Sequence, residues 1–274
     1  MASGVVWFVS TSNPYGAIIV VNKCMETDNK IEVASALSKY STPISVLVGA
    51  IIIAAALTFG DGKLPQQDVA ANPGQAQPDA AALQKQLENI APITAEDHIR
   101  GNPDAPVKIV EYSDTECPFC KRFHPTMQQV MSEYGADGKV AWVYRHFPLD
   151  QLHKKARKEA IALECAGDQG GDDAFWKYTD RLYEVTPSND GLDPSELPKI
   201  ASEVGLNVTT FNTCLASGKF DAHVEADAQN AIATGGSGTP WSIVIGKNGK
   251  KYPLSGAQPY ESVKQIIDLA SQGK

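Results

Sequence analysis

Two cysteines separated by two residues are the part of this sequence best suited to chemistry. They form the segment Cys117-Pro118-Phe119-Cys120 in a chain of 274 residues with five cysteines. A dithiol can exchange disulfides with other thiols, and the exchange requires a thiolate at one sulfur. Whether a thiol ionises near neutral pH depends on its local structure, so the elements around the pair decide what it can do.

A strand and a helix are predicted on the two sides of the pair. Residues 107–113, VKIVEYS, have the composition of a buried strand, and a helix is expected over 118–134. Cys117 is then the N-cap residue, and Pro118 is the first helical residue, where its missing N–H costs nothing. The free N–H groups and the positive end of the helix stabilise a Cys117 thiolate, which lowers a thiol pKa from about 8.5 to roughly 3.5–7.5. Cys120 lies one turn further on, close enough to resolve a mixed disulfide.

Two other interpretations of this motif stay open. The pair could be half of a zinc site with His124 as a third ligand, but the other cysteines are isolated, at 24, 165 and 214, so no second pair completes a four-ligand site. The pair could also form a purely structural disulfide. The strand-to-helix position favours a redox-active pair over both.

The pattern of strands and helices in the rest of the folded part predicts an α/β domain with a helical insert at about 150–234. A second strand is expected at 139–147, a β-hairpin over 241–254 and a closing helix over 260–271. A strand–helix–strand opening implies a parallel pair with a right-handed crossover, and the hairpin adds antiparallel strands. This is the thioredoxin order with helices inserted between its halves. The expected insert helices are 153–166, stopped by Gly167, then 173–185, 194–204, 208–217 and 221–234.

Two sets of side chains in the insert are expected to be structural. The basic run 153–158, HKKARK, is predicted to be a solvated helix face. The aromatic residues are predicted to form core rather than a cofactor site; they are Phe175, Trp176, Tyr178 and Tyr183.

A membrane anchor is predicted over residues 40–60. These residues include no charge, and as a helix they rise about 31 Å, close to a bilayer hydrocarbon core of about 30 Å. A cleaved signal peptide and a buried core helix are the alternatives. Lysines are more frequent before the segment than after it, which predicts a cytoplasmic segment 1–39 and an extracytoplasmic remainder.

A tether and a single folded domain are expected after the anchor. Residues 61–92 are rich in Pro, Gln and Ala, which is typical of a tether, with a short helix at 80–90. The domain is predicted over 93–274. The net charge of −8 argues against nucleic acid as a partner.

Three segments resemble the DsbA-like thiol–disulfide oxidoreductases. VKIVEYSDTECPFCKRFHP resembles their active-site segment, and residues 145–184 resemble the stretch that leads into their helical insert. GGSGTPWSIVIGKNG resembles their cis-proline loop and the next strand. The resemblance covers about 95–270 and implies a thioredoxin-like fold with an inserted helical domain.

The resemblance also assigns roles residue by residue. Cys117 matches the attacking cysteine and Cys120 the resolving one. Pro240 matches the proline whose preceding peptide bond is cis, which turns the Thr239 backbone towards the sulfurs, ready to pair with an extended substrate. Glu111 matches a buried acid that could relay a proton to Cys120, the alternative being a strand-edge residue in solvent.

Three further residues leave questions that the resemblance only partly answers. Enteric members of the family have His at the position of Phe119, which leaves the redox potential and the direction of electron flow open. Cys165 and Cys214 are expected to form a structural disulfide, as the family often has Cys at both points; two unpaired thiols are the alternative. Cys24 is expected to be free on the cytoplasmic side.

The sequence therefore predicts a membrane-anchored, extracytoplasmic thiol–disulfide oxidoreductase. Its expected partners are reduced or misfolded extracytoplasmic proteins and a membrane redox partner, of the quinone-linked kind, that reoxidises it. No small cofactor or metal is required, because the dithiol is the redox group. The alternatives are a reductase or isomerase that uses the same cysteines, and a tethered non-catalytic chaperone or binding module.

Overall fold

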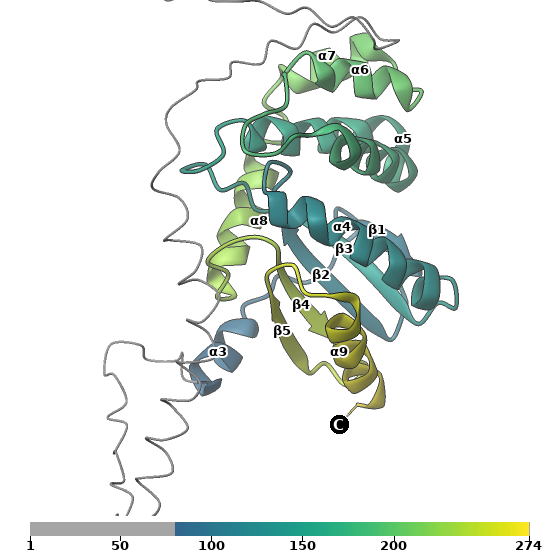
Figure 1. Ribbon diagram of the computed structural model, residues 1–274, viewed down its shortest axis with the longest axis vertical. Helices are drawn as coiled ribbons and strands as arrows, with labels where there is room; N and C mark the ends of the chain where they lie inside the picture. Colours follow the sequence, from purple (N-terminus) through teal and green to yellow (C-terminus); the bar gives the residue numbers. More distant parts are fainter. Residues whose placement is uncertain (1–79, 274) are drawn as a thin grey trace, which may run out of the picture. The chain divides into compact units, whose positions relative to one another are not determined.

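A computed structural model describes residues 80–273 of the chain (Figure 1). The predicted cytoplasmic segment 1–39 with Cys24, the predicted anchor 40–60 and residues 61–79 of the predicted tether lie outside the described residues. Within residues 80–273, no helix combines the length and the apolar character needed to cross a bilayer.

A five-stranded sheet in the order β1-β3-β2-β4-β5 forms the centre of the fold. Strands β2 and β3 are parallel, and every other neighbouring pair is antiparallel. The predicted strands are present, whereas the edge strand β1 was not predicted, because its four residues, HIRG, lack an apolar alternation. The strands are β1 (His98–Gly101), β2 (Val107–Ser113), β3 (Val140–His146), β4 (Trp241–Ile245) and β5 (Lys251–Ser255).

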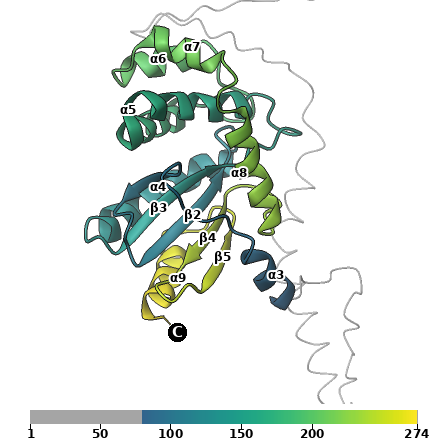
Figure 2. The same cartoon turned by 180° about the vertical axis from the view of Figure 1, so that it is seen from behind.

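Helices cover both faces of the sheet (Figures 1 and 2). One face packs against α4 (Pro118–Val130) and α9 (Tyr260–Gln272), and the other against α3 (Ala80–Leu87) and α8 (Asp221–Ala233). Alternate residues of β2 point to the two sides, so that Ile109 joins the first core and Val110 the second. Because both faces are covered, β2 and β3 are buried along nearly their whole length rather than at alternate residues.

The helical insert follows β3; its first three helices lie in layers beyond α4, and its last helix returns to pack on the sheet (Figure 1). It consists of α5 (Ala156–Val185), α6 (Glu196–Glu203), α7 (Val208–Leu215) and α8. The predicted stop at Gly167 was wrong: the helix runs past it and is interrupted at Gly170 and Gly171, where φ of Gly171 is 63°, a value that glycine adopts without penalty. The four aromatic residues of α5 are buried in the core, as predicted.

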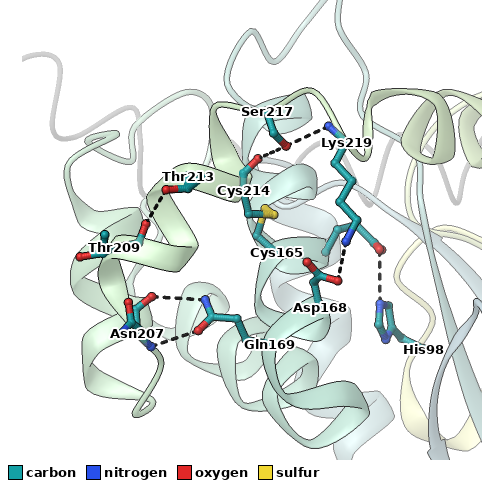
Figure 3. Close-up of a disulfide and its surroundings, with 11 residues drawn as sticks. His98, Cys165, Asp168, Gln169, Asn207, Thr209, Thr213, Cys214, Ser217 and Lys219 are labelled. Atoms are coloured by element: carbon teal, nitrogen blue, oxygen red, sulfur yellow. Dashed lines mark hydrogen bonds and ion pairs between the residues drawn. A yellow bond between two sulfur atoms is a disulfide. The ribbon is translucent and has the colours of Figure 1, made fainter.

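A disulfide joins Cys165 of α5 to Cys214 of α7, the pairing that the resemblance implies (Figure 3). Their Cα atoms are 5.8 Å apart. Polar contacts flank the bridge on both sides: Asn207 N–H donates to Gln169 Oε1 at 3.1 Å, and Lys219 Nζ donates to Asp168 Oδ1 at 2.6 Å. The bridge therefore fastens two layers of the helical insert.

The fold begins earlier than predicted. Residues 80–92 were assigned to the tether, but α3 packs on the domain and Leu87 is fully buried in its core. Asn89 donates to the carbonyl of Ala233, and its own carbonyl accepts from Asn230 of α8. The predicted domain boundary at residue 93 was therefore wrong. The physical reason is that the apolar side of this short helix completes the second core.

Candidate active site

The local structure around the cysteine pair is the predicted one. Cys117 is the N-cap of α4 with extended backbone angles (φ −77°, ψ 121°), and Pro118 occupies the first turn. The Cys117 carbonyl accepts the first helical hydrogen bond, from Lys121 N–H at 3.0 Å. The first-turn N–H groups are therefore free to face the Cys117 sulfur.

The two sulfurs have opposite electrostatic environments. Both cysteines are free thiols in the structure. The pKa of Cys117 is lowered to about 6, first by a hydrogen bond with the Cys120 thiol and then by the Thr239 side chain and the backbone N–H groups of Cys120 and Phe119, against the effect of burial. The pKa of Cys120 is raised well above its usual value, because Cys120 is fully buried and lies beside Cys117. Cys117 is the thiolate of the pair and Cys120 keeps its proton.

The loop before β4 faces the sulfurs. The Thr239–Pro240 peptide bond is cis, as predicted, and the Thr239 carbonyl oxygen lies 3.5 Å from Cys117 Sγ. Gly256 N–H donates to the Pro240 carbonyl at 2.9 Å and ties the loop to the end of β5. The backbone of Thr239 is thus held next to the sulfur at which a substrate would react.

Glu111 is buried within the sheet beneath the cysteines. Its side chain is 1% exposed, and Oε2 has no hydrogen-bond partner among the described residues. Burial raises its pKa to about 7. The alternative of a solvent-exposed strand-edge residue is therefore wrong, and a proton on this carboxyl is in exchange at neutral pH.

A second polar group near the motif was missed by sequence reasoning. Asp114 Oδ2 contacts His153 Nδ1 at 2.9 Å and accepts Leu149 N–H at 2.8 Å. His153 and Ala156 are both buried, and the helix begins only at Ala156, so the prediction that 153–158 form a solvated helix face was wrong at these two residues. Burial lowers the pKa of His153, but the Asp114 carboxylate raises it more, and the net shift is upward. The pair fastens the loop after β3 to the residues just before Cys117.

A pair of buried carboxyl groups lies behind the same turn. Glu116, next to Cys117, and Glu159 of α5 are both buried, and each has an oxygen without a donor among the described residues. Burial, followed by a hydrogen bond with Glu116, raises the pKa of Glu159 to about 9. Glu159 therefore keeps its proton at neutral pH. Glu159 gave no signal in the sequence, because its partner is 43 residues away.

His124, the third ligand in the zinc interpretation, contacts Asp180 of α5. It is buried, and its Nε2 lies 2.7 Å from Asp180 Oδ1, with its ring against Tyr183 and Trp142. Among residues 80–273, no group of three or more His, Cys, Asp or Glu side chains is arranged to hold a metal ion. The histidine is a supporting residue that joins α4 to α5.

Three other histidines surround one carboxylate where the sheet meets the insert. Glu164 Oε1 lies 2.8 Å from His146 Nε2, and Glu164 Oε2 lies 3.4 Å from His98 Nε2. His223 of α8 approaches the same carboxylate at 3.7 Å. Burial opposes the charge of Glu164, but the imidazoles of His146 and His98 lower its pKa far below the usual range. The cluster joins β1, β3, α5 and α8.

Comparison with known proteins identifies the family. The model of the thioredoxin family Thioredoxin_4 matches residues 94–269, which is more than half of the chain. The chain belongs to the thioredoxin family. Among solved structures, this thioredoxin-family chain is 28% identical to DsbA2 of Pseudomonas aeruginosa, with a TM-score of 0.57, over 66% of this chain and 98% of that one. BdbD of Bacillus subtilis, at 23% identity, shares the fold with a TM-score of 0.58 over 66% and 96% of the two chains. The thioredoxin-family domain is therefore of the DsbA-like kind.

The curated proteins that are similar to this thioredoxin-family chain in sequence are named as Na(+)/H(+) antiporters. It is 37% identical over 164 residues to "Na(+)/H(+) antiporter NhaA 1" of Mycolicibacterium gilvum, covering 59% of this chain and 25% of that protein. It is 35% identical over 177 residues to "Na(+)/H(+) antiporter NhaA 1" of Salinispora arenicola, covering 65% and 25%. The chain thus spans about a quarter of the length of these relatives.

Proposed function

We propose that this protein is an extracytoplasmic thiol–disulfide oxidoreductase that exchanges disulfides with protein substrates through Cys117 and Cys120. The observation that carries the proposal is the opposite shift of the two thiols: the pKa of Cys117 falls to about 6, while that of the buried Cys120 rises. A low pKa makes Cys117 both an available nucleophile and a good leaving group at neutral pH.

The exchange runs in two steps when the protein acts as an oxidant. A substrate thiolate attacks Cys117 Sγ of the Cys117–Cys120 disulfide; the new S–S bond forms and Cys120 leaves as a thiolate that takes up a proton. A second substrate thiolate then attacks the substrate sulfur of the mixed disulfide, and Cys117 leaves as a thiolate. The substrate gains a disulfide and loses two electrons, which remain on the two cysteines. The Thr239 backbone beside Cys117 is placed to pair with an extended substrate segment.

An oxidising location on the outer side of a membrane is part of the proposal. The Cys165–Cys214 disulfide supports it, because such bonds persist in oxidising compartments. The uncharged segment 40–60 is long enough to anchor the chain. The curated relatives combine a similar stretch with a longer chain named an antiporter, which fits a domain held close to a membrane. A membrane redox partner would then reoxidise the dithiol.

A reductase or isomerase is the second candidate, and Phe119 is the observation that favours it. This residue lies between the cysteines, is 51% exposed and is contacted by the Arg122 guanidinium, 5.1 Å from the ring centroid. Phe119 has no charge with which to stabilise the Cys117 thiolate, and a less stable thiolate makes the pair less oxidising. A Cys117–Cys120 potential near about −120 mV supports the oxidase, and one at or below about −270 mV supports the reductase.

A substitution pair separates catalysis from binding. Cys117→Ser should abolish disulfide transfer to a reduced, unfolded test protein, whereas Cys120→Ser should still form a mixed disulfide and accumulate it. Both variants are compared with the full chain under the same redox buffer. If Cys117→Ser transfers disulfides at the rate of the unmodified protein, the proposal is wrong and a non-catalytic binding module remains.

The location is tested in intact cells. After brief reduction of intact cells with a membrane-impermeant phosphine, which opens the Cys117–Cys120 disulfide, a membrane-impermeant maleimide should label Cys117 of the full chain without lysis. Deletion of residues 40–60 should release the protein from the membrane fraction. Labelling that requires lysis would contradict the proposed side of the membrane.

A further inference from the structure

A row of polar side chains crosses the buried face of the sheet directly beneath Cys120. Glu111 of β2 pairs with Tyr144 of β3 on one side and with Ser242 of β4 on the other. Ser113, two residues along β2, points to the same face as Glu111 because side chains alternate along a strand. All four are buried. Such a row is costly in an apolar core unless its groups bond to one another.

The helical insert adds a tyrosine to this row. Tyr183, near the end of α5, is buried, and its Oη lies 2.9 Å from Ser113 Oγ and 3.2 Å from Tyr144 Oη. The same hydroxyl approaches the Asp114 carbonyl at 3.5 Å, and Asp114 N–H points to Cys120 Sγ at 3.4 Å. The insert therefore reaches the residues that contact Cys120.

Ser113 is the residue that acts on both the Glu111 carboxyl and the Cys120 thiol. Its hydroxyl lies close enough to the Glu111 carboxyl and to the Cys120 thiol to favour the charged form of each, and so it lowers the pKa of both groups against the effect of burial. A serine hydroxyl has one donor and two acceptor positions. In the mixed disulfide, where Cys117 is no longer a thiolate that accepts the Cys120 proton, one arrangement uses all three: Tyr183 O–H and Cys120 S–H donate to Ser113 Oγ, and Ser113 O–H donates to Glu111.

We propose that Ser113 carries the proton between Cys120 and Glu111, and that Tyr183 of the helical insert is a positioning residue that holds the Ser113 hydroxyl in line. The proposal deepens the proposed function and rests on it. It gives the insert a part in the chemistry beyond covering the sheet.

The relay balances in both directions. When the disulfide closes, Cys120 S–H gives its proton to Ser113 Oγ while Ser113 gives its own proton to the Glu111 carboxylate. The Cys120 thiolate attacks Cys117 Sγ of the mixed disulfide, the Cys117–Cys120 bond forms, and the substrate leaves with the electron pair as a thiolate. When the disulfide opens, Glu111 returns the proton through Ser113 to the departing Cys120 thiolate. The second partner of each step is the substrate thiol or mixed disulfide itself.

Other groups near Glu111 do not offer a competing path. Ser242 Oγ lies in the row but has no hydrogen-bond partner among the described residues. Tyr144 contacts Tyr183 rather than the sulfur, and burial raises the pKa of both tyrosines well above the usual value. Both phenols stay neutral and act as donors.

The test separates the step at Cys117 from the step at Cys120. The reduced full chain is mixed with oxidised glutathione, samples are quenched with acid, and mass spectrometry quantifies the dithiol, the glutathionylated form and the disulfide over time. Formation of the glutathionylated form reports Cys117, and its closure reports Cys120. Ser113→Ala should slow closure about a hundredfold, the lower end of general acid–base effects, and leave glutathionylation within twofold of the unmodified protein.

The pH profile is the readout that a merely structural role would not move. Closure in the unmodified protein should show an inflection near pH 7, from Glu111, and Ser113→Ala should lose it. Glu111→Gln should slow closure to a similar extent, and the double variant should be no slower than the slower single variant, because both remove the same path.

Tyrosine variants give an independent arm that keeps the fold. Tyr183→Phe removes only the hydroxyl and should slow closure about fivefold, the order of magnitude that the loss of one neutral hydrogen bond gives. The matched control is Tyr178→Phe, which removes a hydroxyl from the same helix that donates to the Leu197 carbonyl at 3.0 Å, away from the cysteines; closure should not change.

The outcomes are distinct. Closure at the unmodified rate and with the unmodified pH profile in both Ser113→Ala and Tyr183→Phe overturns the relay. Effects of Ser113→Ala and Glu111→Gln that multiply in the double variant also overturn it. Failure of the unmodified protein to glutathionylate at Cys117 overturns the proposed function instead.

Discussion

Opening the Cys165–Cys214 disulfide should destabilise the domain by a predictable amount. The bridge closes a sequence separation of 49 residues, and in the chain-entropy model a loop of this length restricts the unfolded chain by about 4 kcal/mol at 25 °C. Measured losses on removing native disulfides are typically about 2–5 kcal/mol. We therefore expect Cys165→Ala/Cys214→Ala to lower the free energy of unfolding by about 4 kcal/mol.

Loss of the disulfide should lower the stability of the domain without changing the active site, because polar contacts beside the bridge remain. The Gln169–Asn207 and Lys219–Asp168 contacts join the same elements and keep α7 in place when the sulfurs are removed. Urea denaturation of the double variant, followed by far-UV circular dichroism, gives the free energy. The midpoint should fall while the closure rate at Cys120 stays within twofold, since the bridge lies in the insert and not beside the active site.

The single variants provide the control. Either Cys165→Ala or Cys214→Ala opens the loop, so each should destabilise nearly as much as the double variant, and the two effects should not add. The bridge is also the part of the fold that depends on an oxidising environment. A loss below about 1 kcal/mol in all three variants, against an expectation of about 4, would refute the loop argument.

Two further predictions follow from buried charge. Glu159 has a raised pKa of about 9, so the folded state holds a proton that the unfolded state releases above its usual carboxyl pKa, and stability falls as pH rises from about 5 to 9. Glu159→Gln removes this dependence, and denaturant titrations should show the variant gaining stability relative to the unmodified protein as pH rises; a constant difference would contradict a proton held on Glu159. Burial lowers the pKa of His98, but Glu164 and Asp172 raise it more, and the net shift is upward. Its contribution to stability is full below the usual histidine pKa and is lost as pH rises through the folded value, so His98→Asn should cost more stability at pH 6 than at pH 8.5. An equal cost at both values would show that the imidazole contributes no charge.

The residues that do the proposed chemistry could be found from local pattern. Cys117 and Cys120 follow a strand and open a helix, and both features are encoded by neighbouring residues, which is why β2 and the start of α4 lie where the sequence predicts them. The cis bond before Pro240 and the burial of Glu111 came from resemblance, because no local pattern fixes either. The bridge between Cys165 and Cys214 came from the same source.

The supporting residues depend on tertiary contacts and could not be found this way. His153 sits in a basic run whose other members favour solvent, and only the approach of Asp114 buries it. Glu159 is one carboxyl among many until the fold places it against Glu116. Tyr183 was correctly predicted to be a core residue. Its hydroxyl contacts Ser113 only because the fold brings the end of α5 to the end of β2.

The element boundaries that differ from the sequence prediction also depend on tertiary contacts. The strand β1 is polar and short, and it forms because the edge of β3 offers a partner. The tether prediction extended too far, because a helix of 8 residues is marginal alone and is stabilised here by the core that Leu87 enters.

The central claim is an ionised Cys117 beside a protonated Cys120, and its most direct measurement is the rate of Cys117 alkylation by iodoacetamide against pH. The reduced full chain is used, and mass spectrometry assigns the modified cysteine. The rate should rise with a midpoint near pH 6, as the lowered pKa of Cys117 requires, while Cys120 reacts slowly throughout. A midpoint near about 8.5, that of an ordinary free thiol, would contradict the account.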